Sequence, residues 1–599
     1  MTENSFASSD SVRSAKPLKH ARKVTFDEPL SLELGGRLPS VTVTYEAYGR
    51  LNNDRSNAVF ICHALSGDSH VARHDDDDAP GWWDIAVGPG RPIDTDRFFV
   101  ICPNLLGGCR GTTGPNSINP AAGQPYGTDF PTITIGDMVQ VHLKLLKHLG
   151  IDKALAAVGG SMGGFQVLHW AASFPETLAG VLPIATSARL SSQALAFDVV
   201  GRNAIMRDPN FRGGRYYSSG EMPDVGLAIA RMIGHITYLS REAMKKKFEA
   251  DRLHPRDVPV EFEKKFSVGS YLGYQGAKFV ERFDANSYIV LSMAMDLFDL
   301  GGSVEALARV FDRSQCRWLV LSFTSDWLFP PAESQQIVNA LVSVGHPVSY
   351  CNVASTCGHD AFVLPDDLTA YGELIGSFLL NLSGTKTPRK TKHNNADPKN
   401  VFQTHRLDLE RIMELIPLSA SVLDLGCGDG ALLAMLRTRH ASPVMGVELS
   451  QDAIIECVRQ GLDVIQADLN QGLPEFADHR FDYVVLSQTL QAVRDVERLM
   501  DEMLRVGRRC VVTFPNFGYH KLRKMLAEQG RAPETAGILR HKWYDSPNIR
   551  FFTIADFEDF CAAKGITIHR RITLDTEAGR AVDDDPNLNA DLAMFVISR

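Results

Sequence analysis

A serine flanked by small residues carries the clearest chemical signal in this sequence. Ser161 lies at the centre of a G-x-S-x-G pattern with Gly159 and Gly163, directly after the apolar run 155–158. The pattern predicts a tight turn from a strand into a helix, where small neighbours let other backbone approach closely. The hydroxyl then stands beside the amides of a helix N-terminus, which favour developing negative charge. Taken alone, the stretch also fits a glycine-rich turn whose serine caps a helix.

Two later residues supply the partners that a nucleophilic serine needs. Asp326 follows the apolar run 318–323, and His359 follows the next predicted strand, 348–353. The order serine, acid, histidine, with each residue placed after a strand, is that of an α/β-hydrolase triad. We therefore predict that Ser161, Asp326 and His359 form a catalytic triad.

The oxyanion site follows from the same fold. The predicted strand 58–63 ends in a loop, and in this architecture that loop supplies one backbone N–H while the residue after the nucleophile supplies the other. We assign Leu65 and Met162 as these donors. His63, His70 and His74 precede the acidic run 75–78, but their spacing is not that of a metal site, so we predict a solvated loop and no metal.

The composition is that of a globular protein with more than one domain. The chain has 599 residues, which is too long for a single hydrophobic core. Of these residues 44% are hydrophobic and 22% are charged, as in ordinary globular proteins. The net charge of -9 argues against nucleic-acid and membrane partners, and no apolar run reaches the ~20 residues of a membrane span. The polar N-terminus lacks the apolar core of a secretory signal, and the ten cysteines form no spaced framework. We predict a cytoplasmic protein with reduced thiols.

Changes of pattern divide the chain into parts. Residues 1–20 are predicted to be a disordered tail, and 21–385 a domain of the hydrolase type. Within it the sheet pattern gives way to helical patterns over about 187–312, which predicts a lid that keeps water from the site. Residues 386–399 lack apolar periodicity and are predicted to be a linker, after which strands and helices alternate again over 400–599.

This second domain opens with a strand that enters a glycine-rich turn. Asp424 lies in the strand, Gly426 and Gly428 lie in the turn, and a second strand ends in Glu448, about twenty residues further on. Asp468 follows the next strand. Glycines that let backbone approach a ligand, with an acid for ribose hydroxyls, predict a Rossmann-like nucleoside pocket.

In combination, the motifs of the first domain resemble the homoserine O-acyltransferase (MetX) family of the α/β-hydrolase superfamily. The resemblance spans roughly residues 20–382 and is carried by residues 63–67, 80–83, 107–109, 159–164, 234–240, 282–286 and 358–362. Residues 487–492, 514–517 and 542–549 resemble MetW, a small protein of methionine biosynthesis with a class I S-adenosylmethionine methyltransferase type of fold. The chain is therefore identified as a natural fusion of the two.

The resemblance implies transfer of an acyl group from acyl-CoA to the L-homoserine hydroxyl through an acyl-Ser161 intermediate, with no cofactor for that step. Arg231 matches the family's contact to the substrate carboxylate, and Asp360 its contact to the ammonium. The apolar Leu328 after Asp326 favours acetyl-CoA, whereas Arg110 keeps a succinyl donor as the alternative. A homodimer is the default expectation. An esterase and a non-enzymatic scaffold remain as rival functions.

The second domain departs from a working methyltransferase. No Asn-Pro-Pro-Tyr motif follows its fourth strand, and no general base stands out. We expect it to bind S-adenosylmethionine or a relative at the five residues of its pocket, or to have lost binding, and to support or regulate the acyltransferase.

Overall fold

The computed structural model describes residues 18–249, 266–385, 407–439, 443–532, 543–544, 546 and 548–599. The chain divides into two units, Met1–Thr385 and Lys386–Arg599. The predicted tail lies outside the described residues up to residue 17, and the predicted linker, 386–399, lies entirely outside them.

The first unit is built on a mostly parallel sheet with the strand order β1-β4-β8-β5-β11-β12-β13-β14. In that order the strands are Arg22–Phe26, Val41–Tyr48, Phe99–Pro103, Ala58–Cys62, Ala154–Gly160, Leu178–Ile184, Arg317–Phe323 and Val348–Val353. Strands β8 to β14 pair in parallel, while β4 and β1 pair antiparallel at one edge. The apolar runs of the sequence become buried central strands, as expected of a parallel sheet that is covered on both faces. This is the sheet predicted for an α/β-hydrolase fold.

Helices α1, α2, α8, α9 and α10 accompany this sheet, with bounds Ile135–His148, Met162–Ser173, Val304–Phe311, Pro331–Val344 and Leu368–Leu382. Helix α1 begins with a capping box, because Thr134 accepts from the N–H of Asp137 while the Asp137 carboxylate accepts from the N–H of Thr134. Helix α2 packs on β11 and β12, and α9 packs on β13 and β14. The two strand ends that bear the predicted serine and acid are thus backed by helices.

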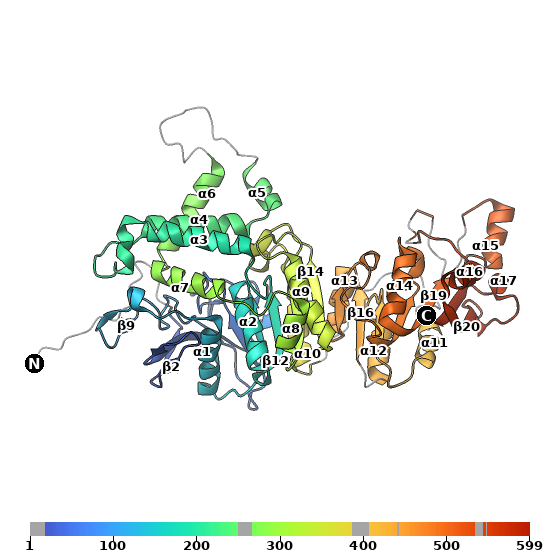
Figure 1. The fold of residues 1–599 in the computed structure, drawn as a ribbon, viewed down its shortest axis with the longest axis horizontal. Coiled ribbons are helices and arrows are strands. Elements are labelled where there is room, and N and C mark those ends of the chain that lie inside the picture. The colour runs from blue at the N-terminus through green and yellow to red at the C-terminus, as the bar shows by residue number, and fades with distance from the viewer. Residues whose placement is uncertain are drawn as a thin grey trace, which may run out of the picture. The chain divides into compact units, whose positions relative to one another are not determined.

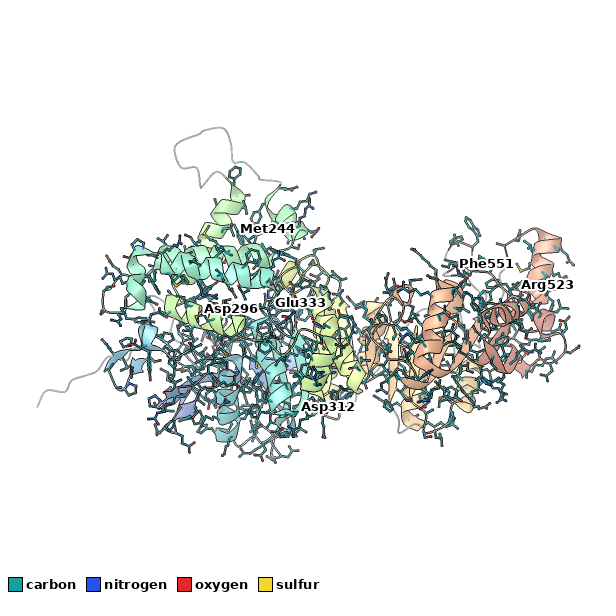
Figure 2. The ribbon with its side chains drawn as sticks, viewed as in Figure 1. Met244, Asp296, Asp312, Glu333, Arg523 and Phe551 are labelled. Atoms are coloured by element: carbon teal, nitrogen blue, oxygen red, sulfur yellow. The ribbon has the colours of Figure 1, made fainter. Side chains whose placement is uncertain are left out.

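A helical insertion lies between the nucleophile and the acid, and the α-helices of its described residues lie in the upper half of the first unit in Figure 1. They are α3 (Ser192–Met206), α4 (Asp224–Tyr238), α5 (Arg241–Phe248), α6 (Ser267–Val280) and α7 (Ala285–Asp296). Figure 2 labels Met244 on α5 and Asp296 on α7, and Glu333 on the sheet-covering helix α9. Helix α4 packs on α3, on α6 and on the segment 358–362. The insertion therefore borders the predicted catalytic histidine.

The second unit contains a sheet in the order β17-β16-β15-β18-β19-β22-β20-β21. Its strands in that order are Val464–Gln466, Val444–Glu448, Val422–Leu425, Phe481–Ser487, Gly507–Pro515, Leu592–Ser598, Thr567–Asp575 and Arg580–Ala581. From β17 to β19 the strands pair in parallel, and β22 is antiparallel to both of its neighbours. Because β16 and β17 lie on one side of β15 and β18 on the other, the strand order reverses there, where open α/β sheets bind ligands. The predicted Rossmann-like arrangement is confirmed.

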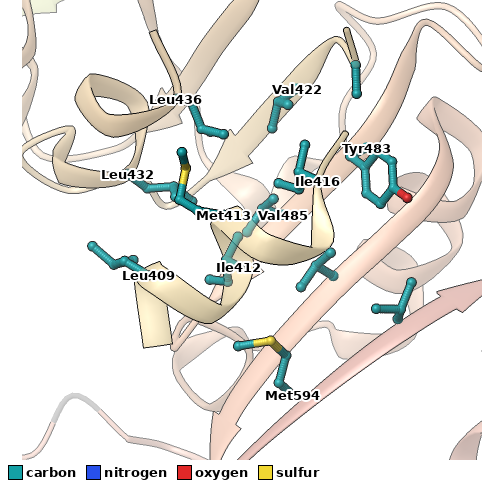
Figure 3. Close-up of a cluster of buried hydrophobic side chains, with 13 residues drawn as sticks. Leu409, Ile412, Met413, Ile416, Val422, Leu432, Leu436, Tyr483, Val485 and Met594 are labelled. Atoms are coloured by element: carbon teal, nitrogen blue, oxygen red, sulfur yellow. The ribbon is translucent and has the colours of Figure 1, made fainter. Parts of the chain in front are cut away.

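Helix α11 (Leu407–Leu415) packs an apolar face into the hydrophobic core of the second unit. Leu409, Ile412, Met413 and Ile416 recur at helical spacing, so they form one apolar stripe. The stripe packs on α12 (Ala431–Arg439) and on side chains of β15, β18, β19 and β22 (Figure 3). Helices α13 (Gln451–Arg459), α14 (Val496–Val506) and α16 (Ile554–Lys564) complete the layers.

Candidate active site

The predicted nucleophile lies where β11 ends and α2 begins. Ser161 has a φ of 57° and a ψ of −126°, a strained conformation for a residue with a side chain. Its N–H donates to the carbonyl of Ile184 at 3.0 Å, and the Thr186 hydroxyl donates to its carbonyl at 2.9 Å. The surrounding structure thus holds the strain that the sequence pattern predicts.

The glycines around Ser161 are required by close approach. A Cβ on Gly163 would lie 2.0 Å from the carbonyl oxygen of Cys62, and one on Gly159 would lie 2.4 Å from that of Gly163. Both positions would collide with backbone, which cannot move aside as a side chain can. Small residues here let α2 press against the end of β5, as the pattern predicts.

Asp326 and His359 form a direct pair. The Nδ1 of His359 lies 2.8 Å from the Oδ2 of Asp326, and both side chains are buried. The other carboxylate oxygen, Oδ1, accepts from the N–H groups of Leu328 at 3.0 Å and Phe329 at 2.9 Å. Because Nδ1 faces the carboxylate, the neutral imidazole keeps Nε2 free to accept a proton.

Strand ends bring Ser161 to the same edge of the sheet. Ser161, Asp326 and His359 follow β11, β13 and β14, which run parallel to one another in a single sheet. The ring of Phe362 links these segments, since a Cβ on Gly160 would lie 2.5 Å from Phe362 while the His359 and Phe362 ring centroids are 5.8 Å apart. The sequence reasoning missed Phe362 as a contact, although it lies in a quoted motif.

The neighbours of His359 control its basicity. Burial alone lowers the pKa of this imidazole, but the carboxylates of Asp326 and Asp360 outweigh burial and leave the pKa raised. Burial likewise raises the pKa of Asp360, against the opposing charges of His359 and Arg231. A raised histidine pKa means that the neutral, proton-accepting form is lost at a higher pH than in a free imidazole.

We expect Asp360→Asn to shift the acid limb of the pH profile. Removing the Asp360 charge removes one cause of the raised pKa, so His359 stays neutral to a lower pH and the limb moves down. The measurement is kcat/KM for the acyl donor, from thiol release as a function of pH. Asp312→Asn makes the same chemical change at an exposed position after α8 (Figure 2) and should leave the limb in place. A limb that is unmoved or shifted upward in Asp360→Asn contradicts this assignment.

One of the two proposed oxyanion donors is a backbone amide in a loop, and the other is a backbone amide at the start of a helix. Met162 is the first residue of α2, and Leu65 lies in the loop after β5. Among the described residues neither N–H donates to a protein acceptor. A preorganised pair of unpaired N–H groups near a nucleophile is what a tetrahedral oxyanion needs.

Arg231 and Asp360 lie at the same site as His359. The Arg231 guanidinium carbon is 5.6 Å from the centroid of the Tyr238 ring, and that ring is 5.8 Å from the His359 ring. The Arg231 charge acts on the Asp360 carboxyl and lowers its pKa against the effect of burial. The structure therefore places Asp360 beside the predicted catalytic histidine in the chain, and Arg231 within the same cluster of residues, near the Tyr238 ring.

The histidines of the predicted solvated loop contact a buried carboxylate of β4 that the sequence did not reveal. The Glu46 side chain accepts from Tyr48 at 2.8 Å and lies 3.0 Å from His70 Nδ1 and 2.9 Å from His74 Nε2. Burial raises the pKa of Glu46, but these hydrogen bonds prevail and hold it at about 2. The contacts of His70 and His74 with Glu46 hold the loop that follows Leu65 against β4. Both histidines therefore have a structural partner.

The residues predicted to line a nucleoside pocket lie in or directly after β15, β16 and β17. The Glu448 carboxylate accepts from the N–H of Gly428 at 2.8 Å, and Asp468 accepts from that of Asn470 at 2.9 Å. Gly426 and Gly428 have φ values of 67° and 56°, and a Cβ on Gly428 would meet nothing within 4 Å. Asp424 is buried in β15. Glu448 therefore borders a left-handed turn at Gly426 and Gly428, and a side chain at Gly428 would meet open space.

Metal and membrane sites find no support in the part of the chain that the structure describes. No group of three or more His, Cys, Asp or Glu side chains there is arranged to hold a metal ion. None of the helices in the same residues is long and apolar enough to cross a membrane. All ten cysteines are free and buried.

Two family models match the chain. The alpha/beta hydrolase fold model matches residues 57–366, and the model of "Methionine biosynthesis protein MetW" matches residues 406–597. The two matches fall in different structural units. The predicted α/β-hydrolase fold and the predicted MetW resemblance are confirmed.

Relatives of known description match both halves. A bifunctional methionine biosynthesis protein MetXA/MetW from Rhodopirellula baltica is 51% identical over 99% of this chain and 95% of its own length. A homoserine O-acetyltransferase from Rhodospirillum rubrum is 51% identical over 59% of this chain and 90% of its own length. A homoserine O-succinyltransferase from Halothiobacillus neapolitanus is 48% identical over 61% of this chain and 90% of its own.

Solved structures resemble the first unit. A homoserine O-acetyltransferase from Bacillus anthracis matches with a TM-score of 0.53 and 29% identity, over 60% of this chain and 98% of its own. Esterase E22 matches with a TM-score of 0.54 and 30% identity, over 60% of this chain and all of its own. The same fold therefore serves both acyl transfer to an acceptor and ester hydrolysis.

Proposed function

The chain belongs to the family of bifunctional MetXA/MetW methionine biosynthesis proteins, and on this premise we propose that its first unit is a homoserine O-acetyltransferase. It transfers an acetyl group from acetyl-CoA to the hydroxyl of L-homoserine. The observation that carries the proposal is the buried Asp326–His359 pair at the strand-end edge where Ser161 occupies its strained turn.

The first half-reaction makes an acyl-enzyme. His359 Nε2 takes the hydroxyl proton of Ser161 as the oxygen attacks the thioester carbon, and the amides of Leu65 and Met162 receive the oxyanion. When the C–S bond breaks, His359 returns the proton to the sulfur and free coenzyme A leaves. Asp326 holds the imidazole in the required tautomer and stabilises its cation.

The second half-reaction transfers the acetyl group. His359 takes the proton of the homoserine hydroxyl, whose oxygen attacks the acetyl carbon. Ser161 leaves as the ester bond breaks and recovers its proton from His359. Arg231 binds the substrate carboxylate and Asp360 its ammonium, so both ends of the zwitterion are matched in charge. No cofactor takes part in these steps.

Acetyl-CoA is the proposed donor, and a succinyl donor is the alternative, since relatives of both kinds match. A succinyl group carries a further carboxylate that needs a cation. Arg110 is the residue that favoured this alternative, and its Nε lies 3.6 Å from the Oδ2 of Asp68. That pairing offsets the Arg110 charge within the protein and so supports the acetyl donor.

An assay of thiol release tests the proposal on the full chain. Release from acetyl-CoA that requires homoserine supports acyl transfer, and a faster rate than with succinyl-CoA supports the acetyl donor. Sustained release without an acceptor, or cleavage of simple esters alone, favours the esterase function of the structural neighbour. No release with either donor contradicts both enzymatic functions.

For the second unit we propose binding of S-adenosylmethionine or a related nucleoside at the glycine turn, with a supporting or regulatory effect on acyl transfer. The support is the left-handed turn at Gly426 and Gly428, which lies beside the Glu448 carboxylate at the reversal of strand order. Calorimetry with S-adenosylmethionine, and the acyl-transfer rate with and without it, test this. No heat of binding together with an unchanged rate rules the proposal out.

We also propose a homodimer formed through the helical insertion. Val225, Ile229 and Ile236 recur on one face of α4 and are 68%, 42% and 43% exposed, and Val200 on α3 is 55% exposed. Apolar groups exposed in such number on two packed helices favour burial against a second copy. A monomeric mass in solution at micromolar concentration contradicts this.

A cytoplasmic location is proposed as well, because ten free cysteines suit a reducing compartment. Cell fractionation tests it, and recovery of the protein from an oxidising compartment would overturn it.

A further inference from the structure

Arg282 lies just beyond α6 and faces the loop that carries Leu65. Its Nη1 donates to the carbonyl of Ser66 at 2.8 Å, and its guanidinium carbon lies 5.4 Å from the centroid of the Phe279 ring. Among the described residues, the bond to Ser66 is the hydrogen bond that this guanidinium makes. A guanidinium has five N–H donors in a planar fork, so most of this donor capacity remains for a ligand.

A second guanidinium shares the Phe279 ring. The guanidinium carbon of Arg231 lies 4.8 Å from the centroid of that ring, against 5.4 Å for Arg282. Burial lowers the pKa of Arg282, and the nearby cation of Arg231 lowers it further. Two cations that repel each other in a partly buried site are stabilised when an anion binds between them.

The carboxylates nearby do not balance these cations. Asp68 is the anion that acts on Arg282, but it is shared with Arg110, whose Nε lies 3.6 Å from the Asp68 carboxylate. Asp360 acts on Arg231 and is also held by His359 and Lys247. Three arginines and Lys247 therefore share two carboxylates, so positive charge is in excess at this site.

We propose that Arg282 and Arg231 together form a two-cation clamp for the carboxylate of the amino-acid acceptor. The carbonyl of Ser66 orients the Arg282 fork, and Phe279 lies against both guanidinium groups. Arg282 is thus a specificity-determining residue that selects an acceptor with a carboxylate over a plain amino alcohol. This inference rests on the proposed function, since it assigns the residue to the acceptor of that reaction.

The test compares two acceptors that differ only in the carboxylate. L-Homoserine and 3-aminopropan-1-ol carry the same hydroxyl and amine, and kcat/KM is measured for each with acetyl-CoA on the full chain. Arg282→Gln should lower kcat/KM for homoserine on the order of 10- to 100-fold, as expected for loss of a hydrogen bond between charged groups. For 3-aminopropan-1-ol it should change by less than about threefold, because that acceptor has no carboxylate to lose.

A second readout separates substrate binding from a purely structural role. The burst of thiol release from acetyl-CoA without acceptor reports acylation of Ser161, and it should persist in Arg282→Gln. Arg282→Lys keeps the charge without the fork and should lose less of the homoserine preference. Lys278→Gln removes a cation at an exposed position of α6, the helix just before Arg282, and should leave the preference unchanged.

The outcomes are distinct. Two results overturn the clamp. One is a thiol burst that falls as far as overall turnover in both Arg282 variants. The other is an unchanged preference for homoserine in Arg282→Gln. If the glutamine variant fails to fold, the preference measured in Arg282→Lys decides. A wild-type chain with no homoserine-dependent release removes the proposed function, and the clamp with it, whereas an active wild type with an unaltered preference in the variants removes the clamp alone.

Discussion

Replacing Ser161 by alanine is expected to lower kcat for acyl transfer by about 10⁶-fold, the scale seen when a serine nucleophile is removed. The acyl-enzyme cannot form without the Oγ, so the thiol burst from acetyl-CoA should vanish together with steady turnover. Intact-protein mass spectrometry should detect an acetyl adduct on the wild type and none on the variant. The fold should persist, because the bonds that hold this turn are made by the Ser161 backbone.

Ser173→Ala is the matched control for this variant. Ser173 is the last residue of the same helix α2, is exposed, and bonds the His169 side chain at 3.2 Å, so its loss should leave the burst intact. Turnover and an acetyl adduct that both survive in Ser161→Ala would rule out the covalent route and leave direct transfer between bound substrates.

Local sequence patterns predicted the elements that position this site. The glycines around Ser161 are dictated by backbone contacts to the end of β5 and within α2, so the pattern and the turn have one cause. The helical pattern predicted over about 187–312 contains α4, and the strand predicted at 348–353 is β14. In each case the residues that form the sequence pattern are also the residues that form the element.

Contacts between distant segments were beyond such patterns. The bond from Arg282 to Ser66 and the pairing of Glu46 with His70 and His74 join residues that are far apart in the chain. The sequence shows the charged residue of each contact, but its partner is determined only when the sheet has formed. Arg282 was visible as part of a motif, but its role depended on Arg231 lying over the same ring.

The second unit shows the same division. Its glycine turn and its acid were predicted from spacing alone, and the structure places the Glu448 carboxylate on the N–H of Gly428. A carboxylate that supports the turn through one oxygen and accepts from the N–H groups of Leu449 and Ser450 through the other is largely satisfied by the protein. Ribose binding would have to share these acceptor oxygens, so binding at this pocket needs the direct measurement proposed above.

Asp326→Asn is expected to lower kcat by about 10⁴-fold while leaving the fold intact. The carboxylate oxygen Oδ1 accepts from the N–H groups of Leu328 and Phe329, and only an oxygen can do this. The asparagine carbonyl therefore keeps that position, and the amide NH₂ replaces Oδ2 opposite Nδ1 of His359. An NH₂ there forces the proton of the imidazole onto Nε2, which then cannot accept the proton of Ser161.

Asp326→Ala separates the chemistry from the folding contribution. It loses the acceptor for both N–H groups as well as the partner of His359, so it should be inactive and also unfold at a lower temperature, since an unpaired buried donor costs about 1–3 kcal/mol. The asparagine variant should match the wild type in thermal unfolding and match the alanine variant in lost activity. Retention of more than a tenth of wild-type kcat by Asp326→Asn would show that the imidazole tautomer is fixed by something other than this carboxylate. In that case the order of residues along the chain would have assigned the acid incorrectly.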